Sequence, residues 1–313
     1  MEIVKLPIVS VIVVTYNSSA TVLETLESIK AQTYDNIELI ITDDCSPDNT
    51  VKICKDWLAA NKSRFVYTEL VTTDHNTGVS GNVNRGILCS HGYWIKCVAG
   101  DDMLFPISID EYLHFVREIS EDINICISDV VPFSTDGEVP LSVLKFWSQC
   151  FKYVQEPYNM QWRRICRELF VVGPGSFFKR DLFDSVGGLS EEYDLGEEWP
   201  FYYKVLKTGN RLYAIDKKLV KYRVSSSSLC HSKDSNGLGN YRLFESSYRF
   251  FFDFPYHELL KDRRYIEVFH FSLMYKIKMY QFKSNNCLIS RFLAKIFKYI
   301  SPYGYLKLLN LIN

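Results

Sequence analysis

The sequence predicts an α/β protein in which a mostly parallel β-sheet carries helices on both faces. Strand-like and helix-like segments alternate through the first hundred residues, which is the order expected of a parallel sheet with crossover helices. The first strand-like run, IVSVIVVTY at 8–16, is apolar almost throughout, as in a strand that is buried on both faces. The 313 residues, 47% of them hydrophobic, are sufficient for a sizeable core.

The elements of the N-terminal part follow one another in a regular order. Strands are predicted at 8–16, 36–44, 64–71 and 92–100, and helices at 19–32, 48–61 and 79–90. In the first of these helices Val22, Leu26 and Ile29 recur at helical spacing, and Ser19 can cap its start.

The pattern is less regular after residue 105. It predicts a helix at 108–119, a strand at 123–133, a turn followed by a strand and a helix within 173–188, a helix at 196–209 and one or two strands in 210–224. Segment 144–170 has no clean period and is expected to be an insertion that covers a site. Beyond residue 240 the chain is predicted to be helical.

Polar and mostly acidic side chains follow the predicted parallel strands. In such sheets ligands bind beyond the carboxyl ends of the strands. These positions are Thr15, Tyr16 and Asn17 after the first strand, Asp43 and Asp44 after the second, Asp74 to Asn76 after the third, and Asp101 and Asp102 after the fourth. One polar strand end is most simply a solvated loop, but four in succession indicate a binding edge.

The motifs that cradle phosphates directly are absent from the sequence. There is neither a GxGxxG turn nor a GxxxxGK[ST] loop after the first strand. Carboxylates can hold a diphosphate only through a divalent cation such as Mg²⁺ or Mn²⁺. Asp101 and Asp102 therefore suggest either a metal-phosphate clamp or a solvated turn. Asp43 and Asp44 can accept hydrogen bonds from a base or ribose, and Tyr16 can stack on a base.

Five segments occur together in a familiar order: VSVIVVTYNS, IELIITDDCSPDNT, NTGVSGNVNRGI, AGDDML and GGLSEEYDLGEEWPFYYKVLKTG. Over roughly residues 7–228 the chain resembles bacterial family 2 glycosyltransferases of the GT-A fold. The resemblance implies transfer of a sugar from a nucleoside-diphosphate sugar, often a UDP-sugar, with inversion and with Mn²⁺ or Mg²⁺. Surface polysaccharide or glycolipid assembly, with a saccharide or a lipid-linked acceptor, is the implied setting.

The resemblance also implies nucleotide contacts. Tyr16 matches the residue that stacks on the base, and Asp44, with Asp43 beside it, matches the carboxylate that meets the base. Asp101 is expected near the ribose and Asp102 at the metal. The full set of implied nucleotide-binding residues is Thr15, Tyr16, Asn17, Asp43, Asp44, Asn84, Arg85, Asp101 and Arg223.

Two positions depart from the family pattern. Many members carry Asp-x-Asp-Asp where this chain has Ala99 in the first position, so its clamp has fewer carboxylates. The family usually has Glu-Asp where this chain has Glu197 and Glu198. Glu198 is the positional match of the catalytic base, which takes the proton of the acceptor hydroxyl. Ordinary charge at a helix N-terminus is the alternative explanation of this pair.

The remaining site residues also come from the resemblance. Arg223 is expected to offset phosphate charge, and His231 is a candidate metal ligand beside Asp101 and Asp102. Four residues are expected to contact the acceptor: Pro174, Gly175, Ser176 and Trp199.

The C-terminal tail is basic, with seven Lys or Arg and no Asp or Glu after Glu267. Segment 287–300 places apolar residues on one face of a predicted helix and basic residues on the other, as in helices that rest on anionic membranes. Docking on the protein core and homodimerisation are the alternatives. No run is long enough to span a membrane, and nine cysteines without a CxxC motif indicate a reducing compartment. The predicted location is the cytoplasm, or the inner face of the plasma membrane.

These observations predict three regions: a nucleotide-sugar-binding half at 1–105, an acceptor-binding half at 106–235 and a helical extension at 236–313. An inverting glycosyltransferase is the first hypothesis. A non-catalytic GT-A module that binds a nucleotide or sugar and scaffolds a synthase complex is the second. A metal-dependent nucleotidyltransferase is the third, but TYNSSATV lacks the Gly-rich basic signature that it needs. The formal charge of −1 indicates no nucleic-acid partner.

Overall fold

A computed structural model describes residues 6–119, 121–193, 195–225 and 240–283, together with residues 292 and 296. Within these ranges the strands form one sheet in the order β3-β2-β1-β4-β7-β6-β8-β5. The strands are β1 (Val9–Thr15), β2 (Ile37–Asp43), β3 (Tyr67–Thr72), β4 (Trp94–Ala99), β5 (Met103–Leu104), β6 (Ile125–Phe133), β7 (Ser176–Lys179) and β8 (Tyr213–Arg223).

The N-terminal half of the sheet is parallel, as the sequence predicts. β1 pairs in parallel with β2 and β4, and β2 pairs in parallel with β3. β7 is antiparallel to β4 and β6, whereas β8 runs parallel to β6 with register shifts around Asp129. Because β1, β2 and β4 are parallel neighbours, their carboxyl ends meet at one edge, and Thr15, Asp43 and Ala99 lie there.

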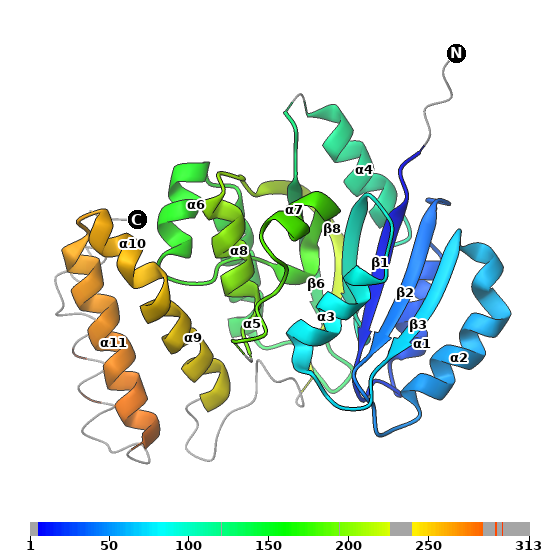
Figure 1. The fold of residues 1–313 in the computed structure, drawn as a ribbon, viewed down its shortest axis with the longest axis horizontal. Helices are drawn as coiled ribbons and strands as arrows, with labels where there is room; N and C mark the ends of the chain where they lie inside the picture. Colours follow the sequence, from blue (N-terminus) through cyan, green and yellow to red (C-terminus); the bar gives the residue numbers. More distant parts are fainter. Residues whose placement is uncertain are drawn as a thin grey trace.

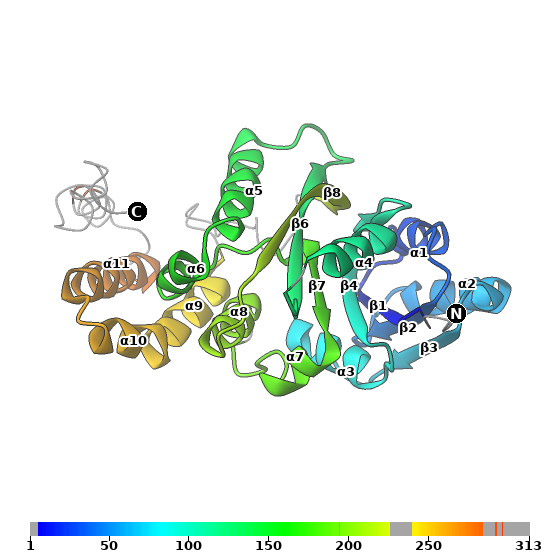
Figure 2. The ribbon, with the colours of Figure 1, turned by 90° about the horizontal axis from the view of Figure 1, so that it is seen from above.

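Helices cover both faces of the sheet (Figures 1 and 2). In Figure 2, α1 (Val22–Lys30), α4 (Ser108–Glu118) and α5 (Leu141–Val154) lie on one side, and α3 (Gly78–Leu88), α7 (Arg180–Ser185) and α8 (Glu198–Lys207) lie on the other. α2 (Thr50–Asn61) packs on α1, and the short helices η1 (Lys62–Arg64) and η2 (Gly173–Gly175) precede β3 and β7. Two-sided cover explains why β1 and β2 are buried almost throughout.

The less regular part of the chain contains helices that the sequence did not predict. Segment 144–170, expected as an insertion without periodicity, falls largely in α5 and α6 (Tyr158–Ile165). α5 packs on β6 and β8, and α6 packs on α8. Region 210–224 forms one strand, β8, and the two-residue β5 is too short to leave a sequence pattern.

The C-terminal region is helical where it is described, as predicted. α9 (Tyr241–Asp253), α10 (Pro255–Lys261) and α11 (Tyr265–Lys283) lie at the opposite end of the molecule from β3 (Figure 1). No helix within the described ranges has the length and apolarity needed to cross a bilayer. The amphipathic segment predicted at 287–300 falls outside the described residues, except for residues 292 and 296.

Candidate active site

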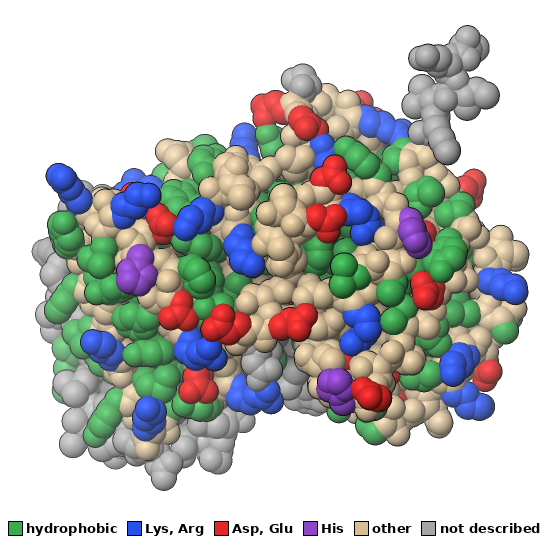
Figure 3. Space-filling view, viewed as in Figure 1, with side chains coloured by type: hydrophobic (Ala, Val, Ile, Leu, Met, Phe, Trp, Pro, Cys, Tyr) green, Lys and Arg blue, Asp and Glu red, His purple; other side chains and the backbone are tan. Residues whose placement is uncertain are grey.

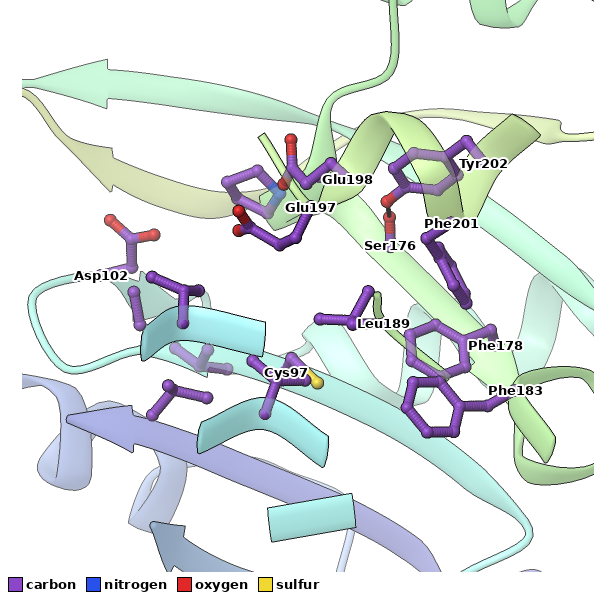
Figure 4. Close-up of a pocket in the computed structure, with 17 residues that line it drawn as sticks. Cys97, Asp102, Ser176, Phe178, Phe183, Leu189, Glu197, Glu198, Phe201 and Tyr202 are labelled. Atoms are coloured by element: carbon purple, nitrogen blue, oxygen red, sulfur yellow. Dashed lines mark hydrogen bonds between the residues drawn. The ribbon is translucent and has the colours of Figure 1, made fainter. Parts of the chain in front are cut away.

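A cavity of about 220 Å³ opens where β1 and β4 end, between these strands and the start of α8 (Figure 4). Asp102 lies at one end of it, and Glu197 and Glu198 line the opposite wall. Most of the other lining side chains are apolar. The cavity therefore brings together Asp102 and the Glu197–Glu198 pair, which the sequence analysis singled out.

Glu198 is the first residue of α8 and Glu197 is its N-cap. Burial raises the pKa of Glu197, while burial and the neighbouring Glu197 carboxylate together raise the pKa of Glu198 to about 8. The positive end of the α8 dipole acts in the opposite direction, but it does not outweigh burial. Glu198 is therefore a carboxylate with a high proton affinity, which is the property that a general base requires near neutral pH.

The Glu198 carboxyl group lies directly against the backbone of Gly173 in η2. A Cβ atom at position 173 would lie 1.6 Å from Oε1 of Glu198. The absence of a side chain at Gly173 therefore makes room for the acid, which is a reason for glycine that has nothing to do with backbone dihedral angles.

A buried polar network holds the turn that carries Gly173. Lys96, in the middle of β4 and fully buried, donates from Nζ to the backbone carbonyls of Pro174 and Ser176, the latter at 3.1 Å. The Tyr112 hydroxyl donates to the Gly175 carbonyl at 2.9 Å and bonds to Ser128 Oγ at 2.7 Å. The wall beside Glu198 is thus held by Lys96 of β4 and by Tyr112 of α4.

The sequence analysis missed Lys96 and Tyr112. The signal was present for Lys96, because a lysine interrupts the apolar run YWIKCVAG and a buried charge in a strand needs partners. Tyr112 leaves no such signal, since an aromatic residue in an amphipathic helix is ordinary.

Arg223 braces the turn that contains Asp101 and Asp102. Its backbone N–H donates to Asp102 Oδ1 at 2.8 Å, and its guanidinium donates to the Asp101 carbonyl at 2.9 Å and to Glu24 at 2.7 Å. Burial and the charge of Asp101 nevertheless raise the pKa of Asp102 well above its ordinary value. Burial also raises the pKa of Asp101. The positive charge of Arg223 therefore does not fully offset the burial and mutual repulsion of Asp101 and Asp102.

This pair fits a divalent cation that arrives with a ligand. Mg²⁺ is commonly held by one or two carboxylates together with substrate phosphates, rather than by a cage of protein ligands. Among the residues that the structure describes, no group of three or more His, Cys, Asp or Glu side chains is placed to hold a metal. His231, the predicted third ligand, lies outside the described residues.

Asp43 and Thr15 lie at the carboxyl edge but are engaged with their neighbours. Asp43 is fully buried and accepts hydrogen bonds from Thr15 Oγ1 at 2.7 Å and from the backbone N–H and hydroxyl of Ser46. The Asn17 backbone N–H donates to the same Ser46 hydroxyl, and Asn17 has a φ of 54°. These residues build the loop after β1, and their predicted nucleotide contacts stay a prediction.

Asp44 joins β2 to the start of α3. It accepts hydrogen bonds from the backbone N–H groups of Thr77 and Gly78, from Thr77 Oγ1 and from Arg85 Nη2 at 2.9 Å. These bonds occupy most of the acceptor capacity of a carboxylate. Asp44 and Arg85 would have to exchange partners to meet a base.

The Tyr16 side chain is exposed, whereas the Asn84 side chain is hydrogen-bonded within the protein. Tyr16 is 52% exposed beside the carboxyl edge, so its ring is available for stacking. The Asn84 side chain donates to the Leu189 carbonyl and accepts from the Leu189 N–H, each at 3.0 Å. In this structure Asn84 therefore attaches the loop before α8 to α3.

The four predicted acceptor residues are not all at the cavity. Pro174 and Ser176 line it, whereas Gly175 and Trp199 do not. A Cβ at Gly175 would lie 2.2 Å from the Ser128 carbonyl oxygen, so close packing on β6 accounts for this glycine. Trp199 is 4% exposed, and its indole N–H donates to the Ile165 carbonyl at 2.7 Å. Its acceptor contact stays a prediction, and the structure gives Trp199 a place in the core.

Comparisons with known proteins agree with this architecture. EpsE of Bacillus subtilis (strain 168), which is named as a glycosyltransferase, is 34% identical over 112 residues, or 36% of this chain and 39% of EpsE. The chain spans 39% and 62% of the lengths of the first two curated relatives that it matches.

Solved structures share the fold at low sequence identity. TarS 1–349 of S. aureus in complex with UDP-GlcNAc gives a TM-score of 0.64 at 18% identity, covering 94% of this chain and 81% of that one. A mannosyltransferase of Pyrobaculum calidifontis in complex with GDP-Man and Mn²⁺ gives a TM-score of 0.53 at 17% identity, covering 82% of this chain and 64% of that one. The chain has the GT-A fold, with a mostly parallel sheet and a helical C-terminal region.

A protein-family model described as glycosyl transferase family 2 matches residues 10–187. This match includes all of β1 except Val9, all of β2 to β4, the Asp101–Asp102 pair and the turn that carries Gly173. Because it covers more than half of the 313 residues, the chain belongs to glycosyl transferase family 2.

Proposed function

We propose that the protein is an inverting glycosyltransferase that moves a sugar from a nucleoside-diphosphate sugar to a hydroxyl group of a saccharide or lipid-linked acceptor. The observation that carries this proposal is the placement of Asp102 and Glu198 on opposite sides of one cavity. In an inverting transfer the acceptor hydroxyl attacks the anomeric carbon on the side opposite to the departing diphosphate. The base and the group that holds the diphosphate must therefore lie on opposite sides of the sugar.

The proposed step is a single displacement. The oxygen of the acceptor hydroxyl forms a bond to the anomeric carbon while the bond from this carbon to the diphosphate oxygen breaks. The diphosphate leaves with the electron pair, and the acceptor proton passes to the Glu198 carboxylate. Glu197 contributes by keeping the proton affinity of Glu198 high, because two adjacent carboxylates resist ionisation together.

Asp102 and Asp101 are the residues that would hold Mg²⁺ or Mn²⁺. Such a cation would neutralise charge on the diphosphate when it is bound. The raised pKa values of both aspartates support this assignment, because a bound cation would favour their charged forms. Arg223 would fix the backbone of the same turn.

The donor proposed is a UDP-sugar, and the TarS complex with UDP-GlcNAc supports this choice for a chain of the same fold. Residues 1–105 would bind the donor, 106–235 the acceptor, and 236–313 would form the extension. Polysaccharide or glycolipid assembly, in the cytoplasm or at the inner face of the membrane, would be the cellular setting.

A second candidate is a non-catalytic module that binds a nucleotide or sugar. The observations in its favour are Ala99, which lines the cavity without supplying a carboxylate, and Glu198, which is one methylene longer than the usual Asp. The two candidates differ in turnover but not in nucleotide binding.

The experiment is UDP release from a panel of UDP-sugars with Mn²⁺ or with a chelator. We expect slow metal-dependent hydrolysis by the wild-type chain, reduced about 100-fold or more in Glu198→Gln and unchanged in Glu138→Gln, an exposed glutamate outside the cavity. UDP binding that needs Mn²⁺, with no release from any donor or acceptor offered, would favour the non-catalytic module. Failure to bind any nucleotide or sugar that is offered would refute both candidates.

A further inference from the structure

The cavity changes its chemical character from one part to another. Its three carboxylates, Asp102, Glu197 and Glu198, face one part, whereas Cys97, Phe178, Phe183 and Phe201 line another part, here called the floor (Figure 4). Burial raises the pKa of the Cys97 thiol to about 12, so this group stays neutral and acts as a small apolar side chain. The Ser176 and Tyr202 hydroxyl groups also line the cavity, but they are hydrogen-bonded to each other. The floor formed by Cys97 and the three phenylalanines therefore offers mainly apolar contact.

The wall beside this floor is rigidly constructed. Leu189 lines the cavity from the loop before α8, and its backbone N–H and carbonyl are both bonded to the Asn84 amide on α3. One residue on, the Ser190 carbonyl accepts from Ser80 Oγ at 2.8 Å. Gly188 has a φ of +67°, and a Cβ there would lie 3.0 Å from Asn84 Oδ1. The apolar wall is thus fixed before any ligand arrives.

A sugar hydroxyl buried against the phenyl rings of this floor would lose its water without gaining a partner there, whereas a methyl group would gain from the same burial. We propose that the floor receives a methyl-bearing substituent of the transferred sugar, either the methyl of an acetamido group or C6 of a 6-deoxyhexose. This inference rests on the proposed function. It assigns the substituent to the donor because the transferred ring must lie between the diphosphate at Asp102 and the base at Glu198.

The test uses pairs of donors that differ in this substituent. The pairs are UDP-GlcNAc with UDP-Glc, UDP-GalNAc with UDP-Gal, and UDP-6-deoxyglucose with UDP-Glc, compared by calorimetric Kd and by kcat/KM of nucleotide release. We expect the methyl-bearing donor to be favoured about 10-fold or more in one pair. A preference within the acetamido pairs would indicate the acetamido methyl, and a preference within the deoxy pair would indicate C6 of a 6-deoxyhexose.

Two polar substitutions of similar size test whether the cavity wall is responsible. Leu189→Asn and Val83→Thr each place a polar atom on this wall, and we expect either change to reduce the donor preference to near unity while UDP affinity is kept. The matched control is Leu88→Asn, at a side chain that is 78% exposed and outside the cavity, which should leave the preference intact. Val83→Thr provides the result if Leu189→Asn fails to fold.

The outcomes separate this inference from the proposed function. Binding of UDP with equal affinity for both members of every pair, or a preference for the hydroxyl-bearing donors, would overturn the inference and leave the proposed function standing. A preference that persists in both wall variants would also overturn it. Absence of binding by UDP and by every donor would refute the proposed function, and the inference with it.

Discussion

At the scale of single residues, Glu198 shows opposing effects on one carboxyl group. Its position at the start of α8 favours the charged form, because the helix N-terminus carries partial positive charge. Burial in the cavity and the charge of Glu197 favour the neutral form, and they prevail, since the pKa rises to about 8. The fold therefore contains a group that is costly to ionise, as functional sites often do.

The raised pKa of Glu198 predicts opposite effects of pH on activity and stability. A carboxyl group whose pKa is raised on folding contributes stability that is present below its unfolded value of 4.5 and is lost as the pH rises through about 8. A base must be deprotonated, so kcat/KM should rise over the upper part of the same range. Glu198→Gln should lower activity yet raise the Tm at pH 8.5 by about 2 °C or more.

Thermal unfolding of both proteins from pH 5 to pH 9 measures this effect. The difference in Tm should widen as the pH rises. A wild-type Tm equal to or above that of Glu198→Gln at pH 8.5 would contradict a buried, poorly compensated carboxyl group at this position.

At the scale of elements, β4 contributes to the site twice. Its end leads into the Asp101–Asp102 turn, and its middle supplies Lys96, which bonds to the turn at Pro174 and Ser176. The Lys96 amine is held away from water and depends on its two carbonyl partners. The same burial lowers the pKa of Lys96 to about 8. One strand thus sets the spacing between the aspartate pair and the wall that supports Glu198.

Replacing Lys96 by Met shortens the side chain by one atom, keeps most of its apolar part and removes its donors. Two buried carbonyl oxygens would lose their partner, at a cost of about 1–3 kcal/mol each in the free energy of unfolding. We expect kcat to fall about 10-fold or more through movement of Gly173 and Glu198, with little change in the KM for the donor. Urea unfolding and steady-state kinetics measure the two effects.

Lys145→Met, at an exposed lysine on α5, is the matched control and should change neither quantity. If Lys96→Met raised KM and left kcat unaltered, Lys96 would act on donor binding rather than on the turn.

At the scale of the whole molecule, the C-terminal helices α9 and α10 pack against α8, the helix that begins with Glu198. Phe250 of α9 packs against Trp199 and Tyr203 of α8, and Lys207 bonds to Glu258 of α10. Hydrophobic side chains remain at the surface over these helices (Figure 3). Phe269 of α11 is 54% exposed. The helix that begins with Glu198 is therefore held from both sides, by the sheet and by the extension.

A buried ion pair makes this docking sensitive to acid. Glu267 accepts from Arg167 at 2.6 Å and also bonds to Arg264. Burial works to raise the pKa of Glu267, but the hydrogen bonds from Arg264 and Arg167 outweigh it and the pKa falls below its ordinary value. This contribution to stability is present above pH 4.5 and is lost as the pH falls through the lowered value.

Glu267→Gln should reduce the free energy of unfolding by about 3 kcal/mol at pH 7, because two buried guanidinium groups would lose their counter-ion. The difference from wild type should shrink near pH 3. Glu192→Gln removes an exposed pair with Arg249 and should cost less than about 1 kcal/mol. Equal losses in the two variants would show that the extension is held by apolar contact alone.

The alternating pattern of the first hundred residues was enough to predict β1 to β4 and the helices between them, because buried parallel strands and amphipathic helices leave strong periodic signals. The same pattern predicted which side chains meet at the carboxyl edge. Family resemblance then directed attention to Glu198 and Asp102. It could not show that Asp43 and Asp44 are saturated by neighbours such as Ser46 and Thr77, since those contacts depend on loop geometry.

The sequence by itself determined the fold class, the acidic edge and the family pattern, because these depend on local periodicity and on residue order. Only the tertiary structure decided that the Glu198 carboxyl group occupies the space left by Gly173, that Lys96 holds the adjoining turn and that Leu189 is fixed by Asn84. Each of these contacts joins residues at least 25 positions apart. Packing across the sheet, rather than any local preference, brings them together.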